Sequence, residues 1–228
     1  MKNVKITFNA IVTSLTLLPA DPSFADTLSC GVPNVTVTFQ QTADGELVCS
    51  AVQQATMLFD TCNLPPLSRP VRITVVEDLS QGCVALYHCG DDMIEVLSAS
   101  KMQERRDPNG AFAHLTADDY YKSVVVHELS HAATDPTPCP FDACIVADEY
   151  IAYAMQIMSL DPEAQQAFEN RSAFEGPISA DDLSVVLLFM APHLFSQKVW
   201  AHLLQRDDPC RYIGQLMDRS LLLDRERF

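Results

Sequence analysis

The sequence predicts an α+β fold in which the strands come first and the helices last. Alternating apolar and polar residues occupy the first half, helical periodicity runs on from Thr116, and no repeat or linker divides the chain. With 228 residues, 48% hydrophobic and 20% charged, the composition is that of a globular protein. We therefore expect one domain over residues 26–228, sheet-rich over 26–115 and helical over 116–228.

The first half contains the predicted strands and one helix. Val35 to Phe39 alternates apolar residues with threonines, which is the period of a half-buried strand, and Asp44-Gly45 predicts a turn after it. Ser50 and Gln53 form a capping box that starts a predicted helix ending near Cys62. Further strands are predicted over 71–76, 84–88 and 93–98, the last two joined by a turn at Gly90-Asp91.

The second half is predicted to be helical throughout. The expected helices span 117–133, 145–159, 162–170, 180–190, 193–206 and 210–222. Two of them begin with an aspartate followed by a proline, Asp161-Pro162 and Asp208-Pro209. An aspartate can cap free N–H groups, and proline fits the first helical position, so both pairs favour a helix start.

Residues 1–25 have the pattern of a secretory signal peptide. A lysine-containing start precedes the apolar run from Ile6 to Leu18, and small residues surround Ala25. The run is too short and interrupted for a membrane span. A lipid anchor at Cys30 is a weaker alternative, because the preceding residues lack the usual leucine. We expect a secreted or periplasmic protein without stable membrane insertion once the signal is removed.

The charge of the chain limits its partners. The formal net charge is −15, and removal of residues 1–25 makes it one unit more negative. Binding to nucleic acid or anionic lipid requires Lys and Arg to neutralise phosphates, so neither partner is expected. Basic substrates are allowed but not required, and the oligomeric state stays open.

Eight cysteines follow the predicted signal, and an even set in a secreted chain predicts four disulfides. Buried thiols or a thiolate metal site are the alternative, disfavoured because no CxxC pair is present. Cys139 and Cys144 flank a short loop and form the expected local pair. The ends of one predicted strand or helix lie too far apart to bridge. This excludes the pairs Cys83–Cys89 and Cys49–Cys62.

The predicted helix over 117–133 contains His127-Glu128-Leu129-Ser130-His131. Residues four apart share a helix face, so His127 and His131 can bind one metal ion, while Glu128 is turned away from them. This is the H-E-x-x-H zinc pattern, in which a carboxylate takes a proton from zinc-activated water. The flanking residues are largely apolar, and two histidines and a glutamate are costly to bury without a partner. A buried, metal-free histidine pair with an ion-paired glutamate is the alternative.

The flanks of the motif carry a family resemblance. Val124 before the first histidine, the uncharged residues within the motif and Ala133 after it fit the long form found in zincin metallopeptidases. The sequence resembles that superfamily over roughly Tyr120 to Met158, which implies a zincin-like fold and one Zn²⁺. Metzincins would need glycine at position 134 and histidine at position 137. Thr134 and Thr137 stand there, so the chain does not resemble that branch.

The resemblance to gluzincins implies a third ligand from the following helix. Glu149 has a spacing close to the gluzincin ligand and is our expected ligand; Asp148 is the competitor. Glu149, Tyr153 and Gln156 also form one stripe, as on any solvated helix face. In zincins a strand beside the cleft binds extended substrate, and 84–88 or 93–98 would take that role. Tyr150 and Tyr153 are possible oxyanion donors or ordinary packed tyrosines.

The leading hypothesis is therefore a secreted zinc metallopeptidase acting on peptides or proteins. His127, His131 and Glu149 would hold the metal, and Glu128 would be the general base. A zincin-fold binding protein without turnover is one alternative. A zinc amidase acting on a non-peptide or cell-wall amide is another, because the same chemistry attacks any amide carbonyl.

Overall fold

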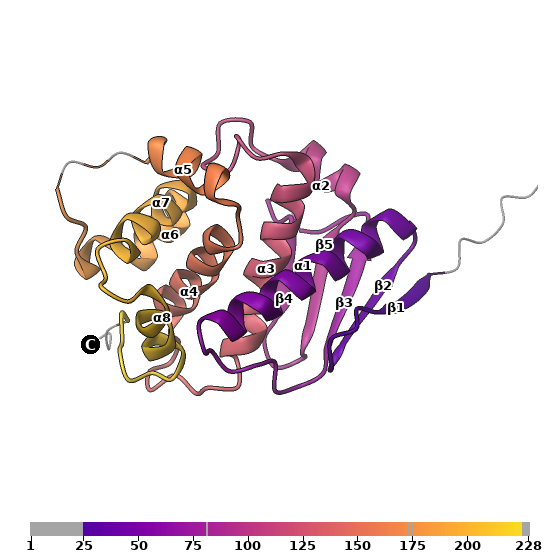
Figure 1. Cartoon of the computed structure of the whole chain (residues 1–228), viewed down its shortest axis with the longest axis horizontal. Coiled ribbons are helices and arrows are strands. Elements are labelled where there is room, and N and C mark those ends of the chain that lie inside the picture. Colours follow the sequence, from indigo (N-terminus) through magenta and orange to yellow (C-terminus); the bar gives the residue numbers. More distant parts are fainter. Residues whose placement is uncertain (1–24, 81, 173, 175, 225–228) are drawn as a thin grey trace, which may run out of the picture.

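The computed structural model describes residues 25–80, 82–172, 174 and 176–224 (Figure 1). Apart from Ala25, the predicted signal peptide lies outside the described residues. In the described part of the chain, no helix combines the length and the apolar character that a membrane span requires.

The described residues form an α+β fold, as predicted. The strands are β1 (Asp26–Ser29), β2 (Val35–Phe39), β3 (Val71–Val76), β4 (Ala85–His88) and β5 (Met93–Leu97). The α-helices are α1 (Thr42–Thr61), α2 (Ala99–Arg105), α3 (Ala117–Thr134), α4 (Ile145–Met158), α5 (Pro162–Asn170), α6 (Val185–Met190), α7 (Pro192–Leu203) and α8 (Pro209–Met217). A 3₁₀ turn, η1 (Ala180–Asp182), precedes α6.

The five strands make one mixed sheet in the order β1-β2-β3-β5-β4. β2 pairs with β3 and β3 with β5 in parallel, whereas the pairs β1–β2 and β4–β5 are antiparallel. Parallel neighbours need a long crossover, and α1 supplies the one between β2 and β3. Figure 1 shows α1 and α3 crossing the sheet on one side. Val71, Ile73 and Val75 of β3 are buried while Arg72 is exposed, so one sheet face carries the core.

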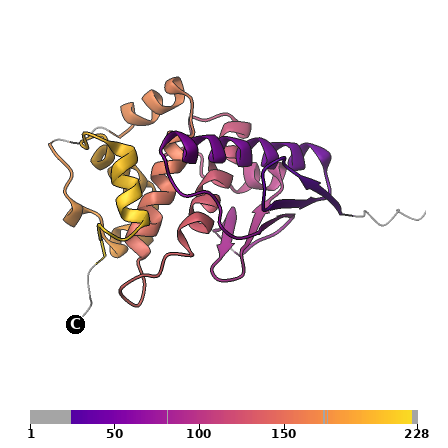
Figure 2. The ribbon, with the colours of Figure 1, turned by 60° about the horizontal axis from the view of Figure 1, so that its bottom comes forward.

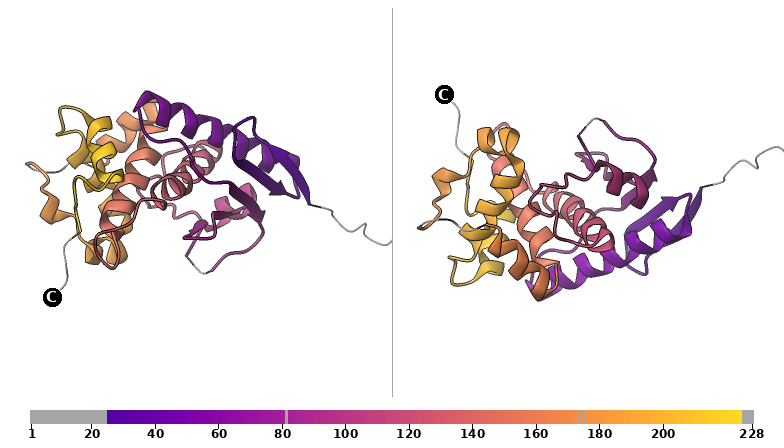
Figure 3. Two further views of the ribbon diagram at one scale, coloured as in Figure 1. Left: turned by 90° about the horizontal axis from the view of Figure 1, so that it is seen from below. Right: turned by 90° about the horizontal axis from the view of Figure 1, so that it is seen from above.

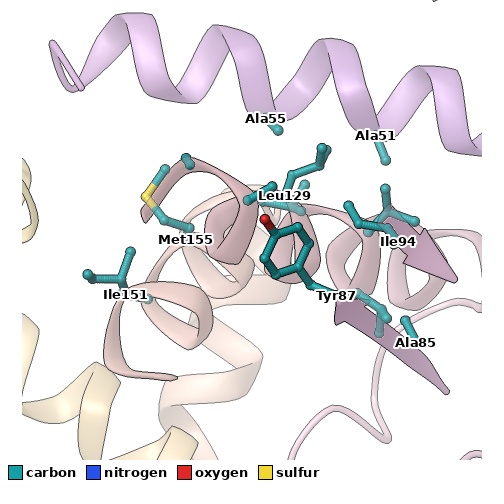
Figure 4. Close-up of a cluster of buried hydrophobic side chains, with 14 of the residues drawn as sticks. Ala51, Ala55, Ala85, Tyr87, Ile94, Leu129, Ile151 and Met155 are labelled. Atoms are coloured by element: carbon teal, nitrogen blue, oxygen red, sulfur yellow. The ribbon is translucent and has the colours of Figure 1, made fainter. Parts of the chain in front are cut away.

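The core continues from the sheet through α1 and α3 to α4. In Figure 4, Ala51 and Ala55 of α1 face Leu129 of α3, beside Ile94 of β5 and Met155 of α4. All five side chains are at most 2% exposed. Small alanines on α1 let the helices approach closely. The helix that carries the H-E-x-x-H pattern is thus packed between α1, the sheet and α4.

The later helices form a second group beyond α3, away from the sheet (Figures 2 and 3). α4 lies between α3 and the helices α6 to α8, which it contacts. The single helix predicted over 180–190 is confirmed only in its second part, because the chain forms η1 and then the separate helix α6. The Ser184 side chain accepts a hydrogen bond from the Leu187 N–H and caps the start of α6.

The start of α1 also differs from the prediction. The helix begins at Thr42, so the capping box at Ser50 and the turn at Asp44-Gly45 are both wrong. The Asp44 carboxylate accepts a hydrogen bond from the Ala99 N–H at the start of α2, at 3.0 Å. A Cβ on Gly45 would lie 2.6 Å from the Phe39 ring. Asp44 and Gly45 therefore make contacts between segments that are far apart in the sequence, and they do not form a turn.

Three disulfides form, not four. They join Cys30 to Cys49, Cys62 to Cys210 and Cys139 to Cys144, which confirms the local pair. Cys83 and Cys89 are free, and their places at the two ends of β4 hold them too far apart to bridge each other, as predicted. Cys30 is oxidised, so the alternative of a lipid anchor on its thiol is wrong. Three disulfides indicate an oxidising environment.

Candidate metal centre

Helix α3 holds the two histidines, whose side chains are partly buried, at 12% and 17% exposure. Its N-cap, Thr116, accepts a hydrogen bond from the Asp119 N–H, and Asp118 and Asp119 place negative charge at the positive end of the helix. Val125 and Val126 are fully buried and Leu129 nearly so. The apolar side of the helix is thus fixed in the core, and the histidine side faces α4.

Helix α4 supplies the third side chain and is anchored at its first turn. The Asp224 carboxylate accepts hydrogen bonds from the N–H groups of Val146 and Ala147, both at 2.9 Å. The Cys139–Cys144 disulfide closes the loop that leads into the helix. Both contacts fix the helix one turn before Glu149.

The side chains of His127, His131 and Glu149 converge. The two imidazole Nε2 atoms lie 3.2 Å apart, and Glu149 carboxylate oxygens lie 3.6 Å from each of them. Ligand atoms around a tetrahedral zinc, at 2.0–2.1 Å from the ion, are separated by about 3.4 Å. The spacing of this group therefore fits one small cation at its centre. Within the described residues, it is the group of His, Cys, Asp and Glu side chains that could hold a metal ion.

Asp148, the competing ligand, is directed elsewhere. Its carboxylate accepts a hydrogen bond from the Arg219 guanidinium at 2.7 Å. Adjacent helical residues point about 100° apart, so only one of the two acidic side chains can face α3. Glu149, and not Asp148, therefore lies beside the two histidines.

Burial controls the protonation of the cluster. It lowers the pKa of His127 well below its usual value, helped by the neighbouring His131, and lowers the pKa of His131 to about 4. Both rings are therefore neutral at pH 7, which is the form that binds metal. Burial, and then the nearby Asp148, raise the pKa of Glu149 to about 7. A cation beside this carboxylate would favour its charged form.

Glu128 lies outside the ligand group, in a contact with the sheet. Its Oε2 atom accepts a hydrogen bond from the Tyr87 N–H of β4 at 2.8 Å. Burial, and then the charge of Glu149, raise the pKa of Glu128 to about 8. The Glu128 carboxylate is thus held between the sheet edge and the three side chains of His127, His131 and Glu149, which we call the metal cluster because they could hold a metal ion.

Strand β4 forms the edge of the sheet next to α3. The Leu97 N–H of β5 donates a hydrogen bond to the Val84 carbonyl, just before β4. In an antiparallel pair every second residue makes such bonds, so the backbone N–H and C=O groups of Ala85 and Tyr87 point away from β5. Of the two strands expected to border the cleft, 84–88 is therefore at the edge. The segment 93–98 contains β5, which lies between β3 and β4, so that alternative is wrong.

The two tyrosines named from the sequence have different surroundings. Tyr150 is fully buried, and its hydroxyl is hydrogen-bonded to His202 Nδ1 at 2.9 Å, so it is a packed residue. The Tyr153 ring meets the His127 ring edge-on, with centroids 4.7 Å apart. Only Tyr153 lies beside the metal cluster.

Gln156 and Ser123 belong to the site and were not identified from the sequence. Gln156 Oε1 lies 3.1 Å from His127 Nδ1, and its Nε2 lies 3.3 Å from Ser123 Oγ. Gln156 is 4% exposed, so the interpretation of its stripe as a solvated face is wrong. The sequence feature that could have identified Gln156 as a site residue was its place on the same helix face as Glu149 and Tyr153.

Two of the cavities in the described part of the chain are large. One, of about 920 Å³, is lined by the loop before α4, by η1 and by the C-terminal segment. It reaches Ile145, one helical turn before Glu149. The other, of about 910 Å³, lies around the Cys62–Cys210 disulfide. Neither is lined by His127, His131 or Glu149.

Comparison with known proteins gives a family but no activity. No curated protein and no solved structure matches the chain. Residues 35–226 match DUF6639, a family of unknown function. This span includes the sheet from β2 onward and both helices of the metal cluster. Because the match covers most of the sequence, the chain belongs to the DUF6639 family.

Proposed function

We propose that this protein is a zinc-dependent metallopeptidase of gluzincin type. His127, His131 and Glu149 hold one Zn²⁺, and Glu128 is the general base. The observation that carries the proposal is the convergence of three ligand side chains, whose ligand atoms are separated by 3.2 and 3.6 Å, with the separate carboxylate of Glu128 close enough to feel the charge of Glu149. Two neutral imidazoles and one carboxylate form the donor set of a catalytic zinc site.

Zinc, when bound, lowers the pKa of a water molecule and polarises the scissile carbonyl. Glu128 contributes the proton chemistry: its carboxylate takes a proton from the attacking water and passes it to the departing amine. The Tyr87 N–H holds this carboxylate in place through its 2.8 Å hydrogen bond. Burial keeps bulk water from competing for the proton.

The edge strand gives the substrate its orientation. An extended peptide can pair with β4 through the outward backbone groups of Ala85, as in other complexes formed by strand addition. Because main-chain groups make these contacts, the expected substrate is a peptide or an unfolded protein segment. The disulfides fit a secreted or periplasmic location for this activity.

One observation favours the non-catalytic alternative. The hydrogen bond between Glu128 and Tyr87 gives the carboxylate a structural contact, so its presence alone does not require catalysis. A zincin-fold binding protein would keep that contact and the metal, but it would cleave nothing. Substitution of Glu128 separates the two functions.

The deciding test is Glu128→Gln in the purified protein. The amide keeps the size of the side chain and removes its ability to accept the proton from water. We expect full zinc content, an unchanged fold and a loss of hydrolysis of about 10²-fold or more. Elemental analysis gives the zinc content, and peptide libraries with and without chelator give the activity.

Each outcome of this test is informative. Cleavage by Glu128→Gln at the wild-type rate would show that the activity belongs to another site or a contaminant. Zinc binding without any cleavage by the wild type would favour the binding protein. Cleavage of cell-wall or other non-peptide amides alone would favour the amidase.

A further inference from the structure

A chain of hydrogen bonds runs behind His127, on the side away from the metal cluster. It passes from the His127 ring to Gln156 on α4, on to Ser123 one turn earlier on α3, and ends at the Tyr120 carbonyl. The three contacts measure 3.1, 3.3 and 2.8 Å. Gln156 is 4% exposed and Ser123 is 1% exposed, so water does not compete with them.

The direction of every bond in this chain follows from its last member. A backbone carbonyl can only accept, so Ser123 Oγ–H donates to the Tyr120 carbonyl. The Ser123 oxygen is then free to accept from the Gln156 amide nitrogen, which turns the Gln156 oxygen toward His127. An amide oxygen also only accepts, so His127 Nδ1 must carry the proton.

The tautomer decides which nitrogen can bind metal. A neutral imidazole carries one N–H and one lone pair. With the proton on Nδ1, the lone pair lies on Nε2, the atom that is 3.2 Å from His131 Nε2 and 3.6 Å from Glu149. The opposite orientation of the amide would place the proton on Nε2 and block this position.

We infer that Gln156, oriented by Ser123, is a positioning residue that fixes His127 in the Nδ1–H tautomer and so prepares Nε2 for the metal. The inference rests on the proposed metal site, and it adds residues that no motif identifies. Helix α4 would then contribute twice to the site: Glu149 as a ligand, and Gln156 as the hydrogen-bond partner of the ligand His127 on α3.

The chain offers matched variants for a test. Gln156→Met keeps the size of the side chain and removes the acceptor, and Gln156→Glu restores an acceptor for the Nδ1 proton. The control for the first is Gln165→Met, because Gln165 donates to the Met158 and Leu160 carbonyls away from the cluster. The control for Ser123→Ala is Ser130→Ala, a serine of α3 equally buried and bonded only to the Val126 carbonyl.

Zinc affinity is the first measurement, by competition with a chelator of known affinity. Loss of a partner behind a metal-binding histidine weakens binding by about 10–100-fold. We expect this loss in Gln156→Met, a smaller loss in Ser123→Ala and wild-type affinity in both controls. Gln156→Glu should bind at least as tightly as the wild type. Equal affinity in Gln156→Met and the wild type would overturn the inference.

Nitrogen NMR of the histidine rings in the metal-free wild type at pH 8 is the second measurement. It reports which ring nitrogen is protonated and needs neither zinc binding nor activity. We expect His127 as the Nδ1–H tautomer, and a mixture of tautomers in Gln156→Met. An Nε2–H ring in the wild type would contradict the inference. A wild type that binds no zinc would instead overturn the proposed function, while the tautomer would still test the hydrogen-bond chain.

Discussion

Asp148 and Glu149 show how one step along a helix separates two roles. Asp148 pairs with Arg219, whose side chain is 8% exposed, and Glu149 faces the histidines. We expect Glu149→Gln to lose bound zinc, because an amide is a much poorer ligand than a carboxylate. Asp148→Asn should keep zinc but lose about 1–2 kcal/mol of unfolding free energy, because Arg219 loses its charged partner.

Zinc content and urea denaturation of the two purified variants test this pair. Both substitutions replace a carboxylate by its amide on neighbouring positions of α4, so each is the control of the other. Zinc loss in Asp148→Asn together with retention in Glu149→Gln would reverse the ligand assignment.

The raised pKa of Glu149 predicts how zinc binding depends on pH. Without metal, burial and Asp148 raise this pKa to about 7, so the carboxyl carries a proton below that pH. Zinc must displace this proton, and its charge also favours ionisation of the neighbouring Glu128, whose pKa is raised to about 8. Affinity should therefore rise with pH from 6 to about 8 and level off above that. His131, with a pKa near 4, adds no proton to displace above pH 6.

Calorimetric titration at pH 6 and pH 8, in buffers with different ionisation heats, measures both affinity and proton release. We expect tighter binding at pH 8 and release of protons at pH 6. Affinity that is independent of pH over this range would show that Glu149 is already ionised or does not bind the metal.

At the scale of elements, two helical glycines predict opposite effects of the same substitution. Alanine is favoured over glycine in a helix by about 1 kcal/mol. In α8, a Cβ on Gly214 would lie 3.6 Å from Leu64, an ordinary contact, so Gly214→Ala should stabilise by roughly 0.5–1 kcal/mol. In α1, a Cβ on Gly45 would lie 2.6 Å from the Phe39 ring. Gly45→Ala should therefore destabilise by about 1–3 kcal/mol, because overpacking outweighs helix propensity.

Thermal or urea unfolding of the two glycine variants gives the comparison directly. Stabilisation by Gly45→Ala would mean that the start of α1 does not pack against β2 as described.

For the whole molecule, the disulfides predict a definite number of free thiols. Cys83 and Cys89 should react with an alkylating reagent in the unreduced, denatured protein, and all 8 cysteines should react after reduction. In the folded protein, burial and then the charge of Asp135 raise the pKa of the Cys89 thiol. Its alkylation should therefore be faster at pH 9 than at pH 7, because the thiolate is the reactive form.

Mass spectrometry of peptides from the alkylated protein identifies the reacting cysteines. The peptide containing Cys139 and Cys144 should stay unmodified before reduction. A Cys83–Cys89 bridge would contradict the position of β4, since a strand holds its two ends apart.

Local spacing in the sequence determined much of the candidate site. Residues four apart in a helix share a face in any fold, so His127 and His131 could be paired before the structure was known. The loop of Cys139 and Cys144 is short enough to close by itself, and the alternation in 35–39 and 71–76 predicted β2 and β3. The position of Glu149 came from the resemblance to gluzincins.

Only the tertiary structure decided the features that join distant segments. Cys62 and Cys210 are separated by 148 residues, and nothing local selects that partner. Gly45 and Asp44 lie inside α1 because Phe39 and the start of α2 pack there, which overrides their turn preference. Gln156 has the spacing of a solvated residue, and it became part of the site because α4 packs against α3. Helix geometry fixes contacts within a few turns, whereas contacts between helices depend on how the whole core packs.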